Sequence, residues 1–229
     1  MAYLQHQFER YFIENGAASW WLTGLKSTLL ITVIALVIGV VLGFTVGIIR
    51  SVHEQTGKLK LANSICKVYL SIIRGTPSMV QLLIFNFIIF ASVSLNEIFV
   101  GGIAFGINSG AYVAEIVRSG IMSIDKGQME AGRSLGLSAG KTMQLIIIPQ
   151  AFKNVLPALI NEMIVLLKET AIIGYIGTTD LTKAATLVQS RTYSAYVPLL
   201  TAALFYWLLV SILTFFMGKV ERRMRKNDR

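Results

Sequence analysis

Charged residues are scarce in this chain of 229 residues: only 14% are Asp, Glu, Lys or Arg, against about 25% in a typical soluble domain. Three stretches contain no charged side chain at all, namely residues 27–49, 75–96 and 192–218. Each is longer than the roughly 20 apolar residues that cross a bilayer as a helix. The composition therefore excludes a soluble enzyme and predicts a protein that crosses a membrane several times.

Cysteine and histidine are almost absent as well. The single cysteine, Cys66, excludes a disulfide within the chain and provides no set of thiolates for a metal. The two histidines, His6 and His53, lie outside the apolar stretches, so no histidine within the membrane is available as a base or a metal ligand. We therefore expect no catalytic residue and no metal site, which argues against an intramembrane enzyme.

Positive charge exceeds negative charge, with 21 Lys and Arg against 12 Asp and Glu and a net charge of +9. In a soluble chain such an excess would indicate nucleic-acid binding. Here the basic residues cluster near the ends of the apolar stretches, where they set the orientation in the bilayer. We therefore expect the lipid bilayer, and no nucleic acid, as the partner of this charge.

The apolar segments predict the fold class. Because only a helix satisfies its own backbone in lipid at this length, we predict an all-α membrane protein with five transmembrane helices. They cover about residues 20–49, 61–93, 97–119, 146–173 and 193–218. Basic residues concentrate in 50–67, 118–141 and the C-terminal tail, which alternate onto one side. The positive-inside rule then places the N-terminus outside and the C-terminus in the cytoplasm.

The same pattern predicts the domain organisation. Residues 1–19 form an extracytoplasmic segment without an apolar core, so we expect no cleavable signal peptide here and a first span that stays in the mature protein. Residues 20–218 form a single transmembrane domain, and residues 219–229 form a basic cytoplasmic tail. Within the domain, residues 120–145 are too charged to span the membrane and form a cytoplasmic loop between helices three and four.

The second apolar segment, 61–93, is too long for one crossing and is interrupted by Gly75-Thr76-Pro77. Thr76 can cap a half-helix and Pro77 can take its first position, which leaves free N–H groups within the membrane. Such an N-terminus attracts a carboxylate, as in transporters with discontinuous helices. Arg74 either reinforces this site or extends to the cytoplasmic headgroups.

Polar residues recur at helical spacing within two of the predicted spans. Polar groups inside a membrane are costly and usually face a cavity or a partner. The third span carries one polar stripe: Asn108, Tyr112, Glu115 and Ser119. The fourth carries another, in which Glu162 stands beside Asn161: Asn154, Asn161 and Lys168. We expect the two stripes to face each other or a pore.

Residues 130–149 of the cytoplasmic loop read EAGRSLGLSAGKTMQLIIIP. Gly140-Lys141-Thr142 looks like the end of a phosphate-binding loop, but the position of the required first glycine holds Leu135. We therefore expect neither an ATP site nor a cofactor in this chain. Glycines interrupt the short helices of the loop, and Pro149 opens the next span. A short helix here either lies on the bilayer or inserts into a groove of a soluble partner.

The spacing within this loop resembles that of a known family. Glu130-Ala131-Gly132, then Gly136 after three residues and Ile146-x-Ile148-Pro149 after nine more, is similar to the EAA loop of ABC-transporter permeases. Gly132 replaces the family's second alanine, and Ile148 replaces its leucine. Further motifs extend the resemblance over residues 20–218 to the polar amino-acid uptake branch: Arg74-Gly75-Thr76-Pro77 with Gln81, residues 109–128, Pro149-Gln150 and Lys168-Glu169-Thr170.

The resemblance implies a permease of a prokaryotic cell membrane that is not itself an enzyme. It implies a second permease subunit, either a copy or a paralogue, and an extracytoplasmic amino-acid-binding protein. It also implies two cytoplasmic ATPase subunits, which bind the ATP. The loop helix of such permeases sits in a groove of the ATPase, so the resemblance assigns coupling contacts to Glu130, Ala131, Gly132 and Gly136.

An amino-acid substrate needs a host for its carboxylate and another for its ammonium. The half-helix at Thr76 and Pro77 suits the first, and Glu115 and Glu162 suit the second. Two acids favour arginine, lysine or histidine as substrate, with glutamine or glutamate as the alternative. The predicted substrate-binding residues are Glu115, Asn161, Glu162, Thr76, Tyr112 and Lys168.

Structural roles remain open for several of these residues. Glu162 or Glu169 can pair with Lys168, Glu115 has Arg118 within one helical turn, and Tyr112 can serve in ordinary helix packing. A function from another class is a channel-type pore subunit without an ATPase. It explains the spans and the polar residues but gives no reason for the loop motif.

Overall fold

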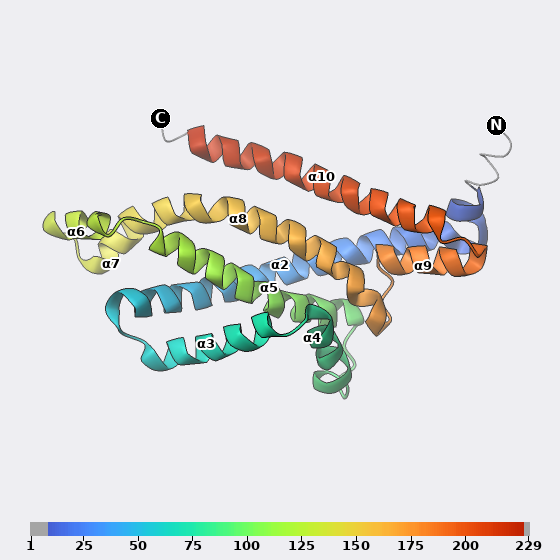
Figure 1. Cartoon of the computed structure of the whole chain (residues 1–229), viewed down its shortest axis with the longest axis horizontal. Helices are drawn as coiled ribbons and strands as arrows, with labels where there is room; N and C mark the ends of the chain where they lie inside the picture. The colour runs from blue at the N-terminus through green and yellow to red at the C-terminus, as the bar shows by residue number, and fades with distance from the viewer. Residues whose placement is uncertain (1–8, 227–229) are drawn as a thin grey trace.

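The computed structural model describes residues 9–226, and almost all of them are helical, with no strand in that range (Figure 1). The predicted all-α class is therefore confirmed. His6 and Arg229 lie outside the described residues. The α-helices are α2 (Ala17–Thr56), α3 (Lys60–Gly75), α4 (Ser78–Ile84), α5 (Glu97–Met122), α6 (Lys126–Ser134), α7 (Ala139–Thr142), α8 (Ile148–Glu169), α9 (Leu181–Thr192) and α10 (Tyr196–Lys226). Five short π- or 3₁₀-helical segments complete the order: η1 (Glu9–Ile13), η2 (Glu14–Gly16), η3 (Phe85–Ile89), η4 (Met143–Ile147) and η5 (Thr170–Ile176).

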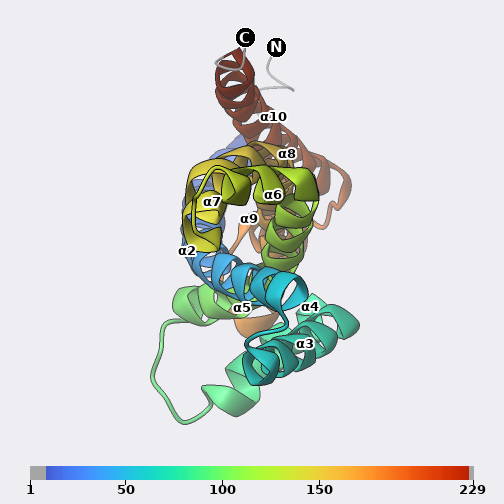
Figure 2. The ribbon, with the colours of Figure 1, turned by 90° about the vertical axis from the view of Figure 1, so that its left-hand side faces the viewer.

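Long helices run roughly along one direction and set the shape of the molecule (Figure 1). Helices α2, α5 and α8 form the centre, α3 lies along one side, and α10 diverges on the opposite side (Figures 1 and 2). The start of α2, the start of α10 and the short helix α9 meet at one end of the bundle. The loop helices α6 and α7 lie at the other end, where α2 also terminates.

The most extensive contact joins α2 and α5, and small residues on both helices make it possible. On α2, Ala35, Gly39, Gly43, Gly47 and Ser51 recur every four residues and are all buried. On α5, Gly102, Gly106, Gly110 and Ala114 do the same. A Cβ placed on Gly43 would lie 2.4 Å from a methyl of Val113, and one placed on Gly106 would lie 2.7 Å from Ile38. The backbones therefore approach too closely for any side chain, which maximises van der Waals contact in the absence of a hydrophobic driving force.

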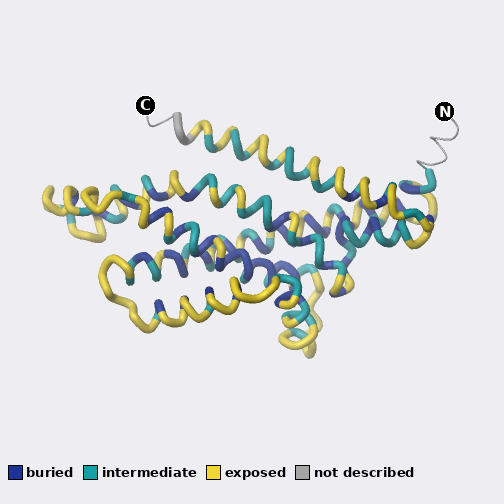
Figure 3. The backbone as a smooth tube through the Cα atoms, in the orientation of Figure 1, coloured by how far each residue is buried: buried dark blue, intermediate teal, exposed yellow. Residues whose placement is uncertain are grey.

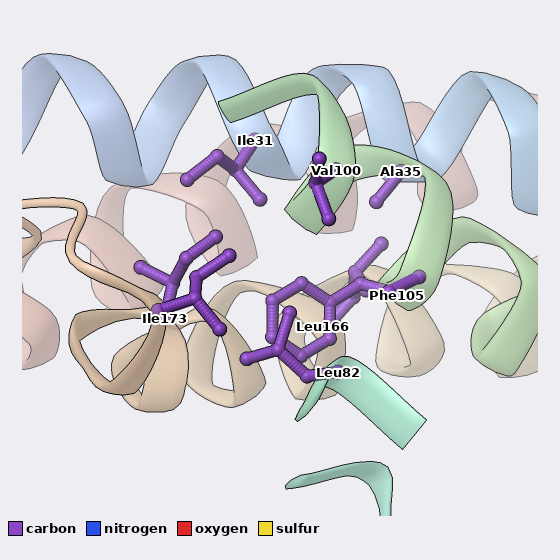
Figure 4. Close-up of a cluster of buried hydrophobic side chains, with 9 residues drawn as sticks. Ile31, Ala35, Leu82, Val100, Phe105, Leu166 and Ile173 are labelled. Carbon is purple, nitrogen blue, oxygen red and sulfur yellow. The ribbon is translucent and has the colours of Figure 1, made fainter. Parts of the chain in front are cut away.

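A core of buried apolar side chains fills the space where α2, α4, α5 and α8 meet. Figure 4 shows Phe105 of α5 beside Leu82 of α4 and Leu166 of α8, with Ile31 of α2 and Ile173 nearby. Burial is greatest along α5 and decreases outward to α3 and α10, which are largely exposed (Figure 3). The core thus holds the polar residues of α5 and α8 in fixed positions.

Three helices of the described chain are long and apolar enough to cross a membrane: Ala17–Thr56, Glu97–Met122 and Tyr196–Arg223. Helix α3 together with Ser78–Ile89 makes a fourth candidate, bent by 107°. Three of the five predicted spans, and the interruption of the second, are therefore present as helices of the expected kind. Helix α8 is not among these candidates, because charged and amide residues interrupt its apolar surface.

The break in the second span lies where the sequence predicts it, but its capping differs. Pro77, not Thr76, is the residue that precedes the first helical residue of α4. The hydroxyl of Thr76 donates to Ile72 O at 2.8 Å and accepts from Gln81 Nε2 at 2.7 Å, so it caps no N–H group. Gln81 Nε2 also donates to Ile73 O at 2.8 Å. The side chain of Gln81 therefore satisfies carbonyls at the end of α3.

The start of the fourth span also differs in detail. Pro149 lies in the first turn of α8, as predicted, but α8 continues directly from η4 without a loop. A proline is tolerated there because the N–H groups of a first turn have no partner within the helix. Pro157 lies farther along α8, inside the helix.

Replacing Gly43 by valine should reduce the stability of the fold. The new side chain would overlap Val113, and such overpacking typically costs about 1–3 kcal/mol. The measurement is thermal unfolding of the purified protein in detergent. Gly218→Val on α10 is the matched control, because a Cβ there meets nothing within 4 Å. An equal loss of stability in both variants would contradict the role assigned to the α2–α5 contact.

Candidate functional site

The polar loop folds as two short helices at one end of the molecule. Helix α6 begins after Asp125, whose carboxylate accepts from Gly127 N, and α7 begins after Ser138, whose hydroxyl accepts from Lys141 N. Gly136 ends the α6 segment with a φ of +87°, a conformation that glycine adopts at no steric cost. Leu137 N donates to Gly132 O at 3.1 Å and closes the turn. Local signals in the sequence therefore specify the shape of this hairpin, which we call the coupling loop after the role that the sequence predicts for it.

The four predicted coupling residues do not share one environment. Glu130, Ala131 and Gly136 are exposed on the coupling loop. Gly132 is buried, and a Cβ there would lie 2.5 Å from the Thr142 methyl and 3.2 Å from Ile146. Gly132 packs against its own loop, so its contact with a partner stays a prediction for which this chain shows no exposed surface. The same contact explains why glycine replaces alanine at this position.

A cleft of ≈ 390 Å³ separates the coupling loop from the end of α2. Its walls include Glu54 and Gln55 of α2, Met122 of α5, and Glu130 and Arg133 of α6. Gln55 Nε2 lies 3.9 Å from Met122 Sδ. This contact joins the ends of α2 and α5, while Met129 of α6 packs against an apolar cluster that includes Ile121 of α5.

The loop also contains two patterns that are typical of enzymes. Gly140-Lys141-Thr142 belongs to α7. A phosphate-binding loop connects a strand to a helix, and no strand precedes α7 in the described residues, so this geometry is not formed. Gly136-Leu137-Ser138-Ala139-Gly140 has the spacing of a hydrolase nucleophile turn, which also requires a preceding strand. Among residues 9–226 none is in a strand, and Ser138 caps α7. Neither pattern forms its catalytic structure here.

Glu115 lies within a cluster of arginines near the end of α5. Arg50 Nη1 donates to Glu115 Oε2 at 2.7 Å, Arg118 Nε donates to Oε1 at 3.0 Å, and Arg118 also donates through Nη2. Arg118 extends further to Glu54 of α2 at 3.1 Å. Both oxygens of Glu115 are therefore engaged, and the prediction that this carboxylate receives a substrate ammonium is not supported. The structural alternative, pairing with Arg118, is the observed one.

Arg74 also turns toward this cluster. Its Nη1 lies 3.8 Å from Glu115 Oε2, and its guanidinium lies 5.7 Å from the centre of the Tyr112 ring. The side chain of Arg74 therefore belongs to the cluster around Glu115. Tyr112 is exposed and serves here as a face for a cation rather than as part of the core.

Glu162 of α8 is half-buried and meets a hydroxyl instead of a cation. Ser109 Oγ of α5 donates to Glu162 Oε1 at 2.8 Å. Asn161 and Lys168 are exposed on the same helix. Within residues 9–226 Lys168 makes no ion pair with Glu162 or Glu169, so the predicted structural pairing is not formed.

The predicted polar stripe on α5 is divided between different partners. Asn108 is buried, and its Nδ2 donates to Gln81 Oε1 at 2.9 Å, which connects α5 to the break between α3 and α4. Ser119 Oγ donates only to the carbonyl of Ile116. Asn154 of α8 donates to Ser123 Oγ at 3.0 Å, beyond the end of α5. The polar contact between α5 and α8 is made by Ser109 and Glu162, which stand beside the predicted stripes and not within them.

Sequence reasoning missed three residues that the structure places at these sites. Ser109 lies at a buried position beside Gly39 and holds Glu162. Arg50 and Glu54 lie at the end of α2 and belong to the arginine cluster. A signal for Arg50 was present, since it is the first charge after a long apolar stretch, but such a charge is also typical of a residue that only sets orientation.

At the opposite end, Asp180 fixes the start of α9. Its carboxylate accepts from the N–H groups of Thr182 and Lys183 and from the hydroxyl of Tyr206, on α10, at 3.1 Å. Burial raises the pKa of Asp180, while these hydrogen bonds to the ionised form oppose the rise. A single carboxylate therefore ties α9 to α10 above the start of α2.

A family profile and several known proteins are similar to this chain. The profile described as "Binding-protein-dependent transport system inner membrane component" matches residues 39–226. The arginine transport system permease protein ArtQ of Bacillus subtilis is 40% identical over 212 residues, 90% of this chain and 93% of the relative. The glutamine transport system permease protein GlnP of Escherichia coli is 34% identical over 207 residues, 89% of this chain and 92% of the relative.

Solved structures are similar to this chain as well. A chain from the crystal structure of an amino acid ABC transporter with histidines has a TM-score of 0.81 and 40% identity, covering 90% of this chain and 94% of that one. A chain of the inward-facing MetNI methionine ABC transporter has a TM-score of 0.79 at 19% identity, covering 93% of this chain and 99% of that one. The second likeness shows the fold alone.

The arginine cluster leads to a prediction on stability. Glu115→Gln should destabilise the fold by about 1–3 kcal/mol, because Arg50 and Arg118 then lose a charged acceptor near the interior. Thermal unfolding in detergent measures the loss. Glu97→Gln removes the same charge from the other, exposed end of α5 and should have little effect. Equal behaviour of the two variants would show that the cluster contributes nothing specific.

Proposed function

Because the chain belongs to the family of binding-protein-dependent transport system inner membrane components, we propose that it is the permease subunit of an ATP-driven amino-acid importer. The observation that carries this proposal is the coupling loop, which presents Glu130 and Ala131 to solvent at one end of the bundle. The relatives support the substrate class, since they are named as arginine and glutamine permeases. A channel-type pore without an ATPase is set aside, because it accounts for neither the family nor the loop.

The proposed topology has five crossings in the transmembrane domain 20–218. Helix α8 corresponds to the fourth span predicted from the sequence, 146–173, and we include it although it is not among the three long apolar helices, because its Glu162 is half-buried against α5. Polar residues in such a helix face a partner or a water-filled path. With this helix included, the segment before residue 20 lies outside, and the coupling loop and the tail after residue 218 lie in the cytoplasm.

The proposed partners follow from surfaces that the chain leaves uncovered. The span Tyr196–Arg223 buries only 6% of its most apolar window within the described chain, so lipid or a second permease subunit covers it. An extracytoplasmic binding protein delivers the substrate at the end that holds α9. Two cytoplasmic ATPase subunits bind ATP and receive the coupling loop, so the permease itself needs no cofactor and is not an enzyme.

Within the coupling loop we propose direct ATPase contacts for Glu130, Ala131 and Gly136. Gly132 supports them indirectly, because it lets α6 lie against Thr142. An exposed amphipathic helix that inserts into a groove is a common way for two proteins to dock. Met129 connects that helix to α5, because it packs against an apolar cluster that includes Val117 and Ile121.

For the substrate we propose a basic amino acid held by Glu162. The carboxylate is half-buried, and its one hydrogen bond in the described chain comes from the neutral Ser109, so a cation remains to be supplied. Asn161 and Lys168, exposed on the same helix, are further candidates for polar contacts, as is Tyr112 on α5. Glu115 is no longer a candidate, because arginines engage both of its oxygens.

The carboxylate of the substrate needs donors. The first N–H groups of α4, directly after Thr76 and Pro77, have no acceptor within their helix and are the proposed donors. Thr76 itself is bonded to Gln81, so its part is to shape the break and not to cap it. Glutamine or glutamate as the substrate is the alternative, and the relatives named as glutamine permeases support it.

Coupling is tested by Gly136→Pro. Proline cannot adopt the φ of +87°, and it removes the N–H that donates to Arg133 O at 3.0 Å. We expect the variant permease to insert into the membrane and to bind the substrate-loaded binding protein. In liposomes it should lose the stimulation of ATP hydrolysis by substrate. Gly140→Ala is the control, since a Cβ there meets nothing within 4 Å. Normal stimulation in the Gly136 variant would refute the proposed role of the loop.

Substrate charge is tested by Glu162→Gln. A buried charge that loses its partner costs about 2–5 kcal/mol, so uptake of arginine should fall much more than uptake of a neutral amino acid. Competition uptake assays with arginine, lysine and glutamine measure this, with Glu97→Gln as a control of equal charge change. Preference of the wild type for glutamine would contradict the basic-substrate proposal. Equal losses for all substrates would assign Glu162 to the common ammonium group alone.

A further inference from the structure

Helix α3 carries a polar stripe along its exposed side. Its members are spaced alternately by four and three residues, as one face of a helix requires, and all are exposed: Lys60, Ser64, Lys67, Ser71 and Arg74. The stripe extends over most of a helix that belongs to a candidate membrane span. Cations at such positions need water or an anionic partner beside them.

The C-terminal part of this stripe, from Lys67 to Arg74, borders a wide-open cavity of ≈ 470 Å³ between α2 and α3. Its charged lining is entirely basic, with Arg50 from α2 and Lys67 and Arg74 from α3, and Ser71 lies between the last two. No carboxylate lines the cavity among the described residues. A site of this composition suits an oxyanion that accepts several charge-assisted hydrogen bonds.

Neighbouring carboxylates leave part of this positive charge unbalanced. Glu115 is shared among three arginines, and Glu54 is shared between two of them. Lys67 makes no ion pair within residues 9–226, and the hydroxyl of Ser71 makes no hydrogen bond there. Three arginines and Lys67 therefore share only two carboxylates. The two side chains without a partner in residues 9–226, Lys67 and Ser71, both line the cavity. An additional anion would complete the cluster.

An apolar stripe runs beside the polar one on the same helix. Its residues are among the most exposed large apolar side chains of the chain: Leu61, Ile65, Val68 and Ile72. A free phosphate ion would satisfy the cations and leave this surface in water. A molecule with a phosphate at one end and hydrocarbon chains at the other would match both stripes.

We propose that the cavity between α2 and α3 binds the phosphate of an anionic phospholipid, whose acyl chains lie along the apolar stripe of α3. Arg50, Lys67 and Arg74 supply the charge, and Ser71 supplies a neutral donor. Basic pockets between helices on the cytoplasmic side are suited to such headgroups, because that leaflet is negatively charged. The lipid would then connect the end of α2 to the helix that leads to the Gly75–Pro77 break.

The test uses the purified full chain in detergent, with bound lipid counted by native mass spectrometry. Phosphatidylglycerol should remain bound and phosphatidylcholine should not. Lys67→Gln should weaken phosphatidylglycerol binding about fivefold, the value of one basic residue near a charged lipid surface. Lys60→Gln removes the same charge from the same stripe outside the cavity and should leave binding unchanged. Ser71→Ala, which breaks no bond within the chain, should also weaken binding.

Four results would overturn the proposal. Equal loss in the Lys60 and Lys67 variants would mean attraction by surface charge alone. Equal retention of phosphatidylcholine, whose choline cation balances its phosphate, would mean that the site does not recognise the net negative charge of the headgroup. Displacement of the lipid by an equal concentration of glycerol phosphate would assign the cavity to a free anion. Unchanged binding in Ile65→Gln would exclude the apolar stripe from the site and leave it to a second permease subunit.

Discussion

The close approach of α2 and α5 is the constraint on which the other helices depend. In lipid no hydrophobic force brings two apolar helices together, so dispersion contacts at short range must hold them. Rows of small residues provide these contacts over several turns, and Val113 and Ile38 fill the space that the glycines leave. One consequence is chemical, because the same surface places Ser109 beside Gly39 and directs its hydroxyl to Glu162 on α8.

The ion pairs of the bundle lie at the end of this contact and depend on its register. Arg50 and Glu115 are 65 residues apart in the chain, and they meet because α2 and α5 end at the same level. A shift of one helix by a turn would separate them and leave buried charge unpaired, which costs more than the pair gains. Packing therefore sets the register, and the cluster penalises any other register.

Much of the fold could be predicted from the sequence, and the limits have physical reasons. Long uncharged stretches indicate helices because lipid permits little else, and Gly75-Thr76-Pro77 marks the break because proline and glycine act locally. Partners brought together by folding carry no such local signal. In the sequence Glu115 resembles a free acid, but in the structure Arg50 of α2 donates to it. Gly132 resembles a surface residue in the sequence, but in the structure Thr142 packs against it. Helix α8 lies within the predicted fourth span, but its charged and amide residues weaken the apolar pattern, so it is not among the three helices that are long and apolar enough to cross a membrane.

The corner between α3 and α4 has a mechanical consequence. Gln81 joins the last carbonyls of α3 to Asn108 of α5, so the two arms of the 107° corner are braced and cannot fold about the break independently. In a corner held in this way, a displacement of α3 along its axis would move Ser78–Ile89 sideways. A displacement of α5 relative to α3 would therefore also move Ser78–Ile89, which leaves α3 at 107°.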